Sequence, residues 1–195
     1  MKILIFHTLI STILFTSIIY SLGLTLTFFS RKNSFELIVS RLGIGIGAFP
    51  VLGLIFNTLK IPLDWRIFLC VSLSYPVYHI IKKKRLPKLS FQKIHFDKTV
   101  FILLIIFAIT LFVYCWGPFQ YPWLEDDDPW SHAAVARFIA TEKTIDIPSG
   151  TFQYLNPYPP AYGIIMGVMH QIHPSIYWIL KFFNGLIISL GILFF

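Results

Sequence analysis

Residues 99–132 read TVFILLIIFAITLFVYCWGPFQYPWLEDDDPWSH. The first part, Thr99–Trp116, contains no Asp, Glu, Lys or Arg, and a run of about 20 apolar residues is what a helix needs to cross a bilayer. Four consecutive carboxylates, Glu125–Asp128, follow closely, although the whole chain has only nine acidic residues. Charges beside a bilayer are costly unless they bind something. The stretch therefore predicts a membrane span that ends in an acidic loop, where we expect the chemistry of the protein.

The composition of the chain is that of a membrane protein. Of its 195 residues, 56% are hydrophobic and 13% are charged, whereas soluble domains average about 25% charged residues. Two cysteines, Cys70 and Cys115, are too few for a disulfide framework. The net charge of +7 is distributed as membrane topology requires, so no nucleic-acid partner is expected. We predict an all-α, multi-pass protein embedded in the lipid bilayer of the cell (plasma) membrane.

About six transmembrane helices are expected from the apolar segments. The first segment is too long for a cleaved signal peptide and lacks a clear small-residue cleavage site, so we interpret it as a retained span. The third holds Pro76 and is short, so residues 61–66 are expected to extend it. The fifth is expected to start near Pro157, and it is joined to the sixth at His173-Pro174. In chain order the segments are Ile3–Phe29, Leu42–Leu59, Ile67–Ile81, Thr99–Trp116, Tyr162–Ile172 and Ser175–Phe195.

The orientation of these spans follows from the basic residues, which are enriched on the cytoplasmic side of membrane proteins. The segment Lys82–Lys98 holds seven of the sixteen Lys and Arg residues, so it is placed in the cytoplasm and the loop 117–160 outside. Lys2 disagrees, because the same count of spans puts it outside. The basic segment either only fixes the topology or also recognises anionic lipid head groups. It divides the chain into an N-terminal transmembrane region (1–98) and a second region (99–195).

The residues after the acidic run have the sequence of a helix start. Asp128 can cap the free backbone N–H groups, and Pro129 fits the first turn, which predicts a helix over about 129–143. An apolar stripe predicts that this helix lies along the outer membrane surface. The stripe comprises Trp130, Ala134 and Phe138, with Val135 and Ile139 beside it. An interfacial belt of aromatic residues is expected from Trp116, Phe119, Tyr121, Trp123 and Trp130.

The acidic run has two interpretations. Asp126 and Asp128 can both point at one divalent cation, Mg²⁺ or Mn²⁺, since carboxylate oxygens are the ligands such ions prefer; alternatively they form a solvated cap and turn. His132, four residues after Asp128, can share its helix face, or it is a surface histidine without a role. Arg137 can clamp a phosphate or lie at the interface as a snorkelling cation. Tyr158 can stack on a sugar ring or anchor the chain at the interface.

Together these features resemble the first outer loop of GT-C glycosyltransferases. Asp128-Pro129-Trp130 is similar to the Asp-Pro-Trp of the catalytic subunit of oligosaccharyltransferases. Tyr158-Pro159-Pro160-Ala161-Tyr162 and the later segment Trp178–Asn184 are more similar to the protein mannosyltransferase and aminoarabinose transferase branch. The resemblance covers about Thr99–Phe195, half of the chain. Each motif is short, so their specificity comes from the set.

The resemblance implies an enzyme that transfers a sugar from a polyprenyl-phosphate donor at the outer face. In that superfamily the aspartate of the first loop binds the metal or acts as the catalytic base, which carries over to Asp128, with Asp126 as second candidate. The chain departs from the family, because GT-C enzymes have many more spans and further acidic motifs in later loops. We therefore expect an N-terminal part of a longer enzyme, or a truncated product, that is inactive alone.

A non-enzymatic membrane protein is the alternative: a transporter fragment or an assembly subunit. A transporter places ionisable residues in the middle of its spans. Only Lys181 qualifies here, and it is expected about one and a half turns from the cytoplasmic end of its span, close enough to snorkel. The carboxylates lie in a loop instead, which favours chemistry at the membrane surface. A further outer acidic motif downstream in the gene would support the enzyme.

Overall fold

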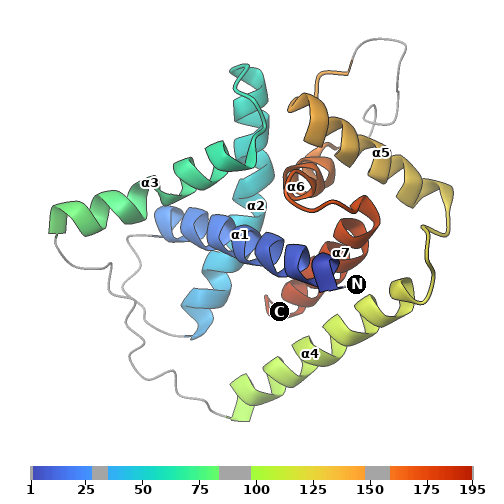
Figure 1. Ribbon diagram of the computed structural model, residues 1–195. Coiled ribbons are helices and arrows are strands. Elements are labelled where there is room, and N and C mark those ends of the chain that lie inside the picture. Colours follow the sequence, from blue (N-terminus) through green and yellow to red (C-terminus); the bar gives the residue numbers. More distant parts are fainter. Residues whose placement is uncertain (1, 28–34, 84–97, 148–158, 195) are drawn as a thin grey trace.

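The computed structural model describes residues 2–27, 35–83, 98–147 and 159–194. All regular structure in these ranges is helical, which confirms the predicted all-α class (Figure 1). The helices are α1 (Lys2–Leu26), α2 (Phe35–Thr58), α3 (Trp65–Lys83), α4 (Lys98–Phe119), α5 (Asp127–Glu142), α6 (Ala161–His170) and α7 (Ile176–Ile192).

Three of these helices, α1, α2 and α4, are long and apolar enough to cross a membrane. This supports a membrane protein, but the expected six spans are not confirmed. Helix α6 has ten residues, which rise about 15 Å, whereas the hydrocarbon core of a bilayer is about 30 Å thick. Helix α7 is also short, at 17 residues. The fifth expected span was to start near Pro157, which lies outside the described residues, and the helix found within it runs only from Ala161 to His170.

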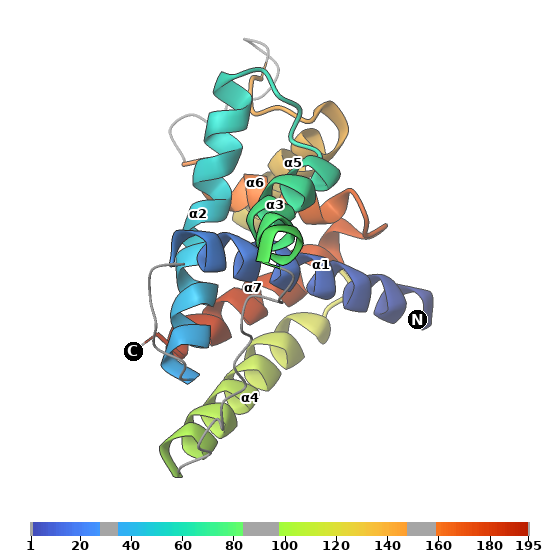
Figure 2. The ribbon, with the colours of Figure 1, turned by 90° about the vertical axis from the view of Figure 1, so that its left-hand side faces the viewer.

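Helices α1 and α2 are in backbone contact. A Cβ atom at Gly23 would overlap the carbonyl oxygen of Arg41, and one at Gly45 would overlap that of Ile19. Glycine is therefore required at both positions for the helices to approach so closely. Figures 1 and 2 both show α1 running across α2 and not alongside it, so the two helices cannot both lie parallel to one membrane normal.

The core of the protein joins the two sequence regions. Phe15 of α1 packs edge-on against Phe183 of α7, with ring centroids 5.2 Å apart. Phe49 of α2 packs on Phe68 of α3 at 4.8 Å, and all four side chains are fully buried. Each such ring contributes a large buried apolar area. The basic segment at 82–98 is thus a boundary in sequence composition but does not divide the hydrophobic core.

A polar network fastens three chain connections at one end of the molecule. The backbone N–H of Leu63, between α2 and α3, donates to the carbonyl of Lys143 at 2.7 Å, and Lys143 Nζ forms an ion pair with Asp64 at 2.6 Å. The Gln171 amide donates to Leu63 O and accepts from Trp65 N–H. The α2–α3 connection, the end of α5 and the end of α6 therefore lie together, as they would on one side of a membrane.

The electrostatics of this network favour the ionised form of its two aspartates. Burial raises the pKa of Asp64, but the hydrogen bonds from Lys143 and from the Arg66 N–H, with the charges of both residues, outweigh it and lower the pKa overall. The pKa of Asp146 is lowered by hydrogen bonds from Lys60 and Asn57. Both aspartates are therefore charged at neutral pH, and they hold the connections as ion pairs.

Helix α7 begins beside the end of α4 and runs back along it. Lys181 Nζ, near the start of α7, donates to Tyr121 O just after α4 at 2.5 Å, whereas Gly185 lies against Cys115, further back in α4. The turn His173-Pro174 is thus at the same end of the molecule as Tyr121. The expectation that this turn, and the nearby Lys181, lie at the opposite end of the molecule from Tyr121 was wrong, since the ten residues of α6 rise only about 15 Å.

Candidate functional site

Helix α5 begins two residues earlier than the sequence indicates. Asp126, with extended backbone angles (φ −137°, ψ 165°), is the N-cap, and its side chain accepts from the Asp127 N–H at 2.8 Å. Asp128 was expected to be the cap but lies inside the first turn, and Pro129 is the third helical residue. A proline is tolerated there because the first N–H groups of a helix have no intrahelical acceptor. The helix itself agrees with the predicted 129–143 to within two residues at each end.

The buried face of α5 is turned towards α6. The buried positions are Ala133, Val135, Ala136 and Ile139, while Ala134 is exposed; Val135 and Ile139, expected to face the membrane surface, thus pack inside the protein. Their partners are glycines: a Cβ at Gly163 would lie 2.6 Å from Val135 Cγ1, and one at Gly167 would lie 2.7 Å from Ile139 Cβ. The apolar side of α5 thus packs on α6 and orients the first turn of α5.

An aromatic cluster holds the acidic run over α7. The Trp130 indole N–H donates to the Leu124 carbonyl at 3.1 Å. The rings of Trp123 and Trp130 contact Tyr177 edge-on, with centroids 5.8 Å and 5.5 Å away. The tryptophans also remain partly exposed, at 61% and 43%, as residues at a membrane interface do. The loop that carries the carboxylates is therefore held in place by this hydrogen bond and these ring contacts.

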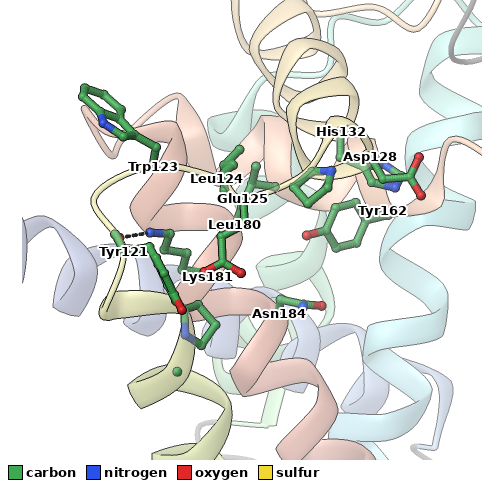
Figure 3. A pocket seen from close by; sticks show the side chains of 13 residues that line it. Tyr121, Trp123, Leu124, Glu125, Asp128, His132, Tyr162, Leu180, Lys181 and Asn184 are labelled. Atoms are coloured by element: carbon green, nitrogen blue, oxygen red, sulfur yellow. Dashed lines mark hydrogen bonds between the residues drawn. The ribbon is translucent and has the colours of Figure 1, made fainter.

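Beneath this loop lies a pocket of about 770 Å³ (Figure 3). It is lined by residues from the end of α4, the following loop, the first turns of α5 and α6, and one face of α7. Its polar side chains are Glu125, Asp128, His132, Tyr162, Lys181 and Asn184, and its other walls are Gly117, Pro118, Tyr121, Trp123, Leu124, Pro129 and Leu180.

The polar groups occupy different parts of the pocket. Lys181 is only 8% exposed, and its amine, bonded to Tyr121 O, lies 5.8 Å from the centre of the Phe119 ring. In Figure 3, Glu125 and the Tyr162 hydroxyl point into the space, and the Asp128 carboxylate lies at its other end, beyond His132. The His132 ring packs edge-on against Tyr162 at 5.0 Å. A carboxylate and a cation thus line one half-open pocket with an aromatic wall.

Of the predicted site residues, the structure brings Asp128 and His132 to the pocket. Asp126 caps α5 instead, and Arg137 is exposed on α5 away from the lining residues. Tyr158 lies outside the described residues, so its role as a substrate contact remains a prediction. Sequence reasoning missed four lining residues as site residues: Glu125, Tyr162, Lys181 and Asn184. Lys181 had a signal, since it is a cation within an otherwise apolar helix.

The donor chemistry of the pocket suits a hard cation in part. Glu125 and Asp128 supply carboxylate oxygens to one cavity, the ligand type that Mg²⁺ and Mn²⁺ prefer. One Asp126 oxygen is engaged in the helix cap. Within the ranges that the structure describes, no group of three or more His, Cys, Asp or Glu side chains is arranged to hold a metal ion. A cation here would need ligands from its substrate or from water as well.

Comparisons with known proteins yield no relative for this chain. No protein-family model matches it, and no significant match was found among curated proteins or solved structures. The features of the chain that bear on its function are therefore the pocket and the short motifs around it.

Proposed function

We propose that this chain is the N-terminal part of an integral-membrane glycosyltransferase that transfers a sugar from a polyprenyl-phosphate donor at the outer face of the membrane. The observation that carries the proposal is the pocket at the end of α4, which combines Asp128 and Glu125 with the buried amine of Lys181. The pocket lies at the end of α4, a helix that is long and apolar enough to cross a membrane, which supports a site at the membrane surface. An amphiphilic donor needs such a place, where an apolar tail and a charged head are both accommodated.

An apolar groove beside the pocket suits the lipid tail of such a donor. It has a volume of about 410 Å³ and is lined by Ile5, Thr8, Leu9, Thr12, Phe119, Trp178 and Phe182. Phe119 connects it to the pocket, because the Lys181 amine lies over the same ring. Phosphate at the Lys181 end would place the attached sugar towards Glu125, Tyr162 and Asp128. Tyr162 and His132 supply the aromatic wall against which a sugar ring stacks.

The chemistry assigned to the carboxylates follows from the transition state of glycosyl transfer. The sugar becomes oxocarbenium-like as its bond to phosphate breaks, and a carboxylate within hydrogen-bond reach removes the proton of the acceptor hydroxyl. Asp128 is our candidate for this base, as the resemblance implies. A divalent cation, held by Asp128 with help from Glu125 or Asp126, would supply charge stabilisation to the leaving phosphate. Arg137 and Tyr158 remain candidate contacts to more distant parts of the substrate.

Asp128→Asn tests the proposal in the full-length enzyme. Because the amide keeps the size of the side chain and removes its charge, we expect sugar transfer to fall by at least about 10²-fold while membrane insertion is unchanged. Asp127→Asn is the matched control, since it removes the same charge from the same helical turn but does not line the pocket. Equal losses in the two variants, or near-normal transfer by Asp128→Asn, would overturn the proposed role.

A binding measurement tests the donor class on the chain itself. Polyprenyl phosphate titrated into the chain in lipid nanodiscs, with Mg²⁺ or Mn²⁺ present, should quench tryptophan fluorescence, and Lys181→Met should weaken this binding at least about tenfold, a loss of about 1.4 kcal/mol. The alternative, a non-enzymatic subunit, is favoured by one observation: the Lys181 amine already has an acceptor in Tyr121 O. If Lys181 only fastens the loop, Lys181→Met will destabilise the fold and leave the affinity unchanged.

A further inference from the structure

The beginning of α1 is tied to the α6–α7 turn by histidines. His7 Nδ1 lies 3.0 Å from the Ile172 carbonyl oxygen, and His173 Nε2 lies 3.2 Å from Thr8 Oγ1. The two imidazole rings are 6.1 Å apart and nearly perpendicular. His173 is only 1% exposed, although it belongs to a turn. These contacts join the first helix of the chain to residues 165 positions later.

The hydrogen bonds favour one protonation state of His173. The Ser175 N–H donates to His173 Nδ1 at 3.1 Å, and we assign Nδ1 on this basis as an acceptor without a proton. The Thr8 hydroxyl donates to Leu4 O at 2.8 Å, so its oxygen accepts from His173 Nε2. His173 is therefore neutral with its proton on Nε2, and every bond runs in one direction, from Ser175 through His173 and Thr8 to Leu4.

We propose that His173 is a protonation-sensitive latch that fastens the N-terminal part of α1 to the start of α7 while neutral and releases it when protonated. A proton on Nδ1 faces the Ser175 N–H, which then loses its acceptor. Ser175 is the N-cap of α7, where its side chain accepts from Trp178 N–H. Nδ1–H can then donate to Ser175 O at 3.0 Å, an oxygen that it shares with the Ile179 N–H, but the Ser175 N–H faces a second donor and is left without its acceptor.

The neighbours of His173 do not offset a charge on it. The titratable groups that face it are His7 on α1 and His170 on α6, whose Nδ1 lies 2.9 Å from His173 O, and Arg137 on α5 acts on His170 in turn. None of these three side chains is an acid that could supply a negative charge to His173. Among the described residues, His173 forms no ion pair with a carboxylate.

The direction of the pH effect follows from this environment. Burial lowers the pKa of His173 below its usual value, the carbonyls of Ser175 and Leu4 act in the opposite sense, and the charges of His7 and His170 lower it further. An imidazole whose pKa is lower in the latched state than in the released state favours release as the pH falls. The latch is therefore fully closed above about pH 6.5, the pKa of a free histidine, and opens in acid.

Opening of the latch would also change the surroundings of the pocket and of the apolar groove beside it. Trp178, in the first turn of α7, stacks on the His173 ring with 23° between the planes, and Lys181 and Asn184 follow it on the same helix. The apolar groove also loses one wall if α1 moves, since Thr8 and Leu9 line it. The inference does not depend on the proposed sugar transfer, because it concerns only the position of α1.

Spin-label distances test the latch in the full chain in lipid nanodiscs, with Cys70 and Cys115 replaced by serine. Labels at Ile13 on α1 and Ala134 on α5, both exposed, should give one distance at pH 7.5. A second, longer distance should appear in acid. The ratio of the population with the longer distance to the population with the shorter one should rise by up to about tenfold for each unit by which the pH falls, as expected for one proton. A single unchanged distance from pH 7.5 to pH 5 would overturn the proposal.

Matched variants separate His173 from the other histidines. His173→Asn does not titrate and keeps an acceptor for the Ser175 N–H, so its distances should not respond to pH. His170→Asn, which removes a neighbouring imidazole from α6, should retain the response. A His173→Asn protein that still opens in acid would refute the latch. Nitrogen-15 NMR of the wild-type chain gives an independent test, since a proton on Nδ1 of His173 at pH 7.5 would contradict the assigned hydrogen bonds.

Discussion

Replacement of Gly167 by alanine should disturb the contact that orients the acidic end of α5. A Cβ at this position would lie 2.7 Å from both Ile139 Cβ and Cγ2 and 2.9 Å from the Ala136 carbonyl oxygen. Ile139 is fully buried, its side chain is branched at Cβ and stiff, and Ala136 O is backbone. Neither neighbour can move aside independently, so the two helices must separate by a few tenths of an ångström or more.

The magnitude follows from two opposing terms. Overpacking of a tight core contact costs about 1–3 kcal/mol, and alanine gains about 1 kcal/mol over glycine in a helix interior. Gly47→Ala on α2 has the second term alone, because no atom lies within 4 Å of the Cβ position. The difference in unfolding free energy between Gly167→Ala and Gly47→Ala therefore isolates the packing cost, and we expect about 1–3 kcal/mol in favour of Gly47→Ala.

Reversible unfolding in mixed micelles with increasing denaturing detergent, followed by tryptophan fluorescence, measures this difference. Affinity for polyprenyl phosphate should also fall in Gly167→Ala, because His132 and Tyr162 line the pocket from the two helices that are forced apart. A Gly167→Ala protein as stable as Gly47→Ala would show that α5 and α6 are not in the contact described, and the geometry of the pocket would have to be revised with it.

Two further predictions concern the ion pairs and the topology. Asp64→Asn should destabilise the fold by about 1.5–3 kcal/mol at pH 7, the range for hydrogen bonds to charged groups, and the exposed Asp146→Asn by less than about 1 kcal/mol. Because the folded-state pKa of Asp64 lies below its unfolded value, the stability difference between wild type and Asp64→Asn should be complete above about pH 4 and vanish as the pH falls through the folded-state pKa. Thermal unfolding of the wild type and Asp64→Asn measured against pH would contradict this if the difference persisted in stronger acid. In intact cells, cysteine at Thr141, which is exposed on α5, should react with an impermeant maleimide, and cysteine at Ser90 in the basic segment only after lysis; the reverse pattern would invert the topology.

The helix after the acidic run was predictable from sequence because its signals are local. Capping residues, a proline in the first turn and an apolar periodicity all act within one or two turns, and they located α5 to within two residues at each end. The cap itself was misplaced from Asp126 to Asp128, since consecutive aspartates are equally able to cap. Only the backbone angles, extended at Asp126 and helical afterwards, distinguish them.

The pocket could not be predicted in the same way, because its parts are distant in sequence. Lys181 lies 60 positions from the carbonyl that it contacts, and nothing local in its helix indicates which end of the molecule it faces. That end depends on whether α6 crosses the membrane, and apolar composition over Tyr162–Ile172 does not reveal that the helix ends after ten residues. A local pattern predicts a helix, but its direction depends on all helices before it.

The charges within the pocket bear on which ligand it accepts. The residues that line the pocket include two carboxylates, Glu125 and Asp128, but only one amine, Lys181, which is already hydrogen-bonded to a carbonyl, so the pocket carries an excess of negative charge. A phosphate adds to this excess, and like charges in a partly enclosed site repel each other more strongly than in water. The proposed donor therefore requires an additional cation, and the carboxylate oxygens are suitable ligands for it. A non-enzymatic pocket of the same residues has no such requirement, and would favour a neutral or cationic ligand. A test of whether polyprenyl phosphate binds only in the presence of Mg²⁺ or Mn²⁺ thus separates the two functions. The acidic run separates them less directly, because one of its aspartates, Asp126, has a structural role as the cap of α5.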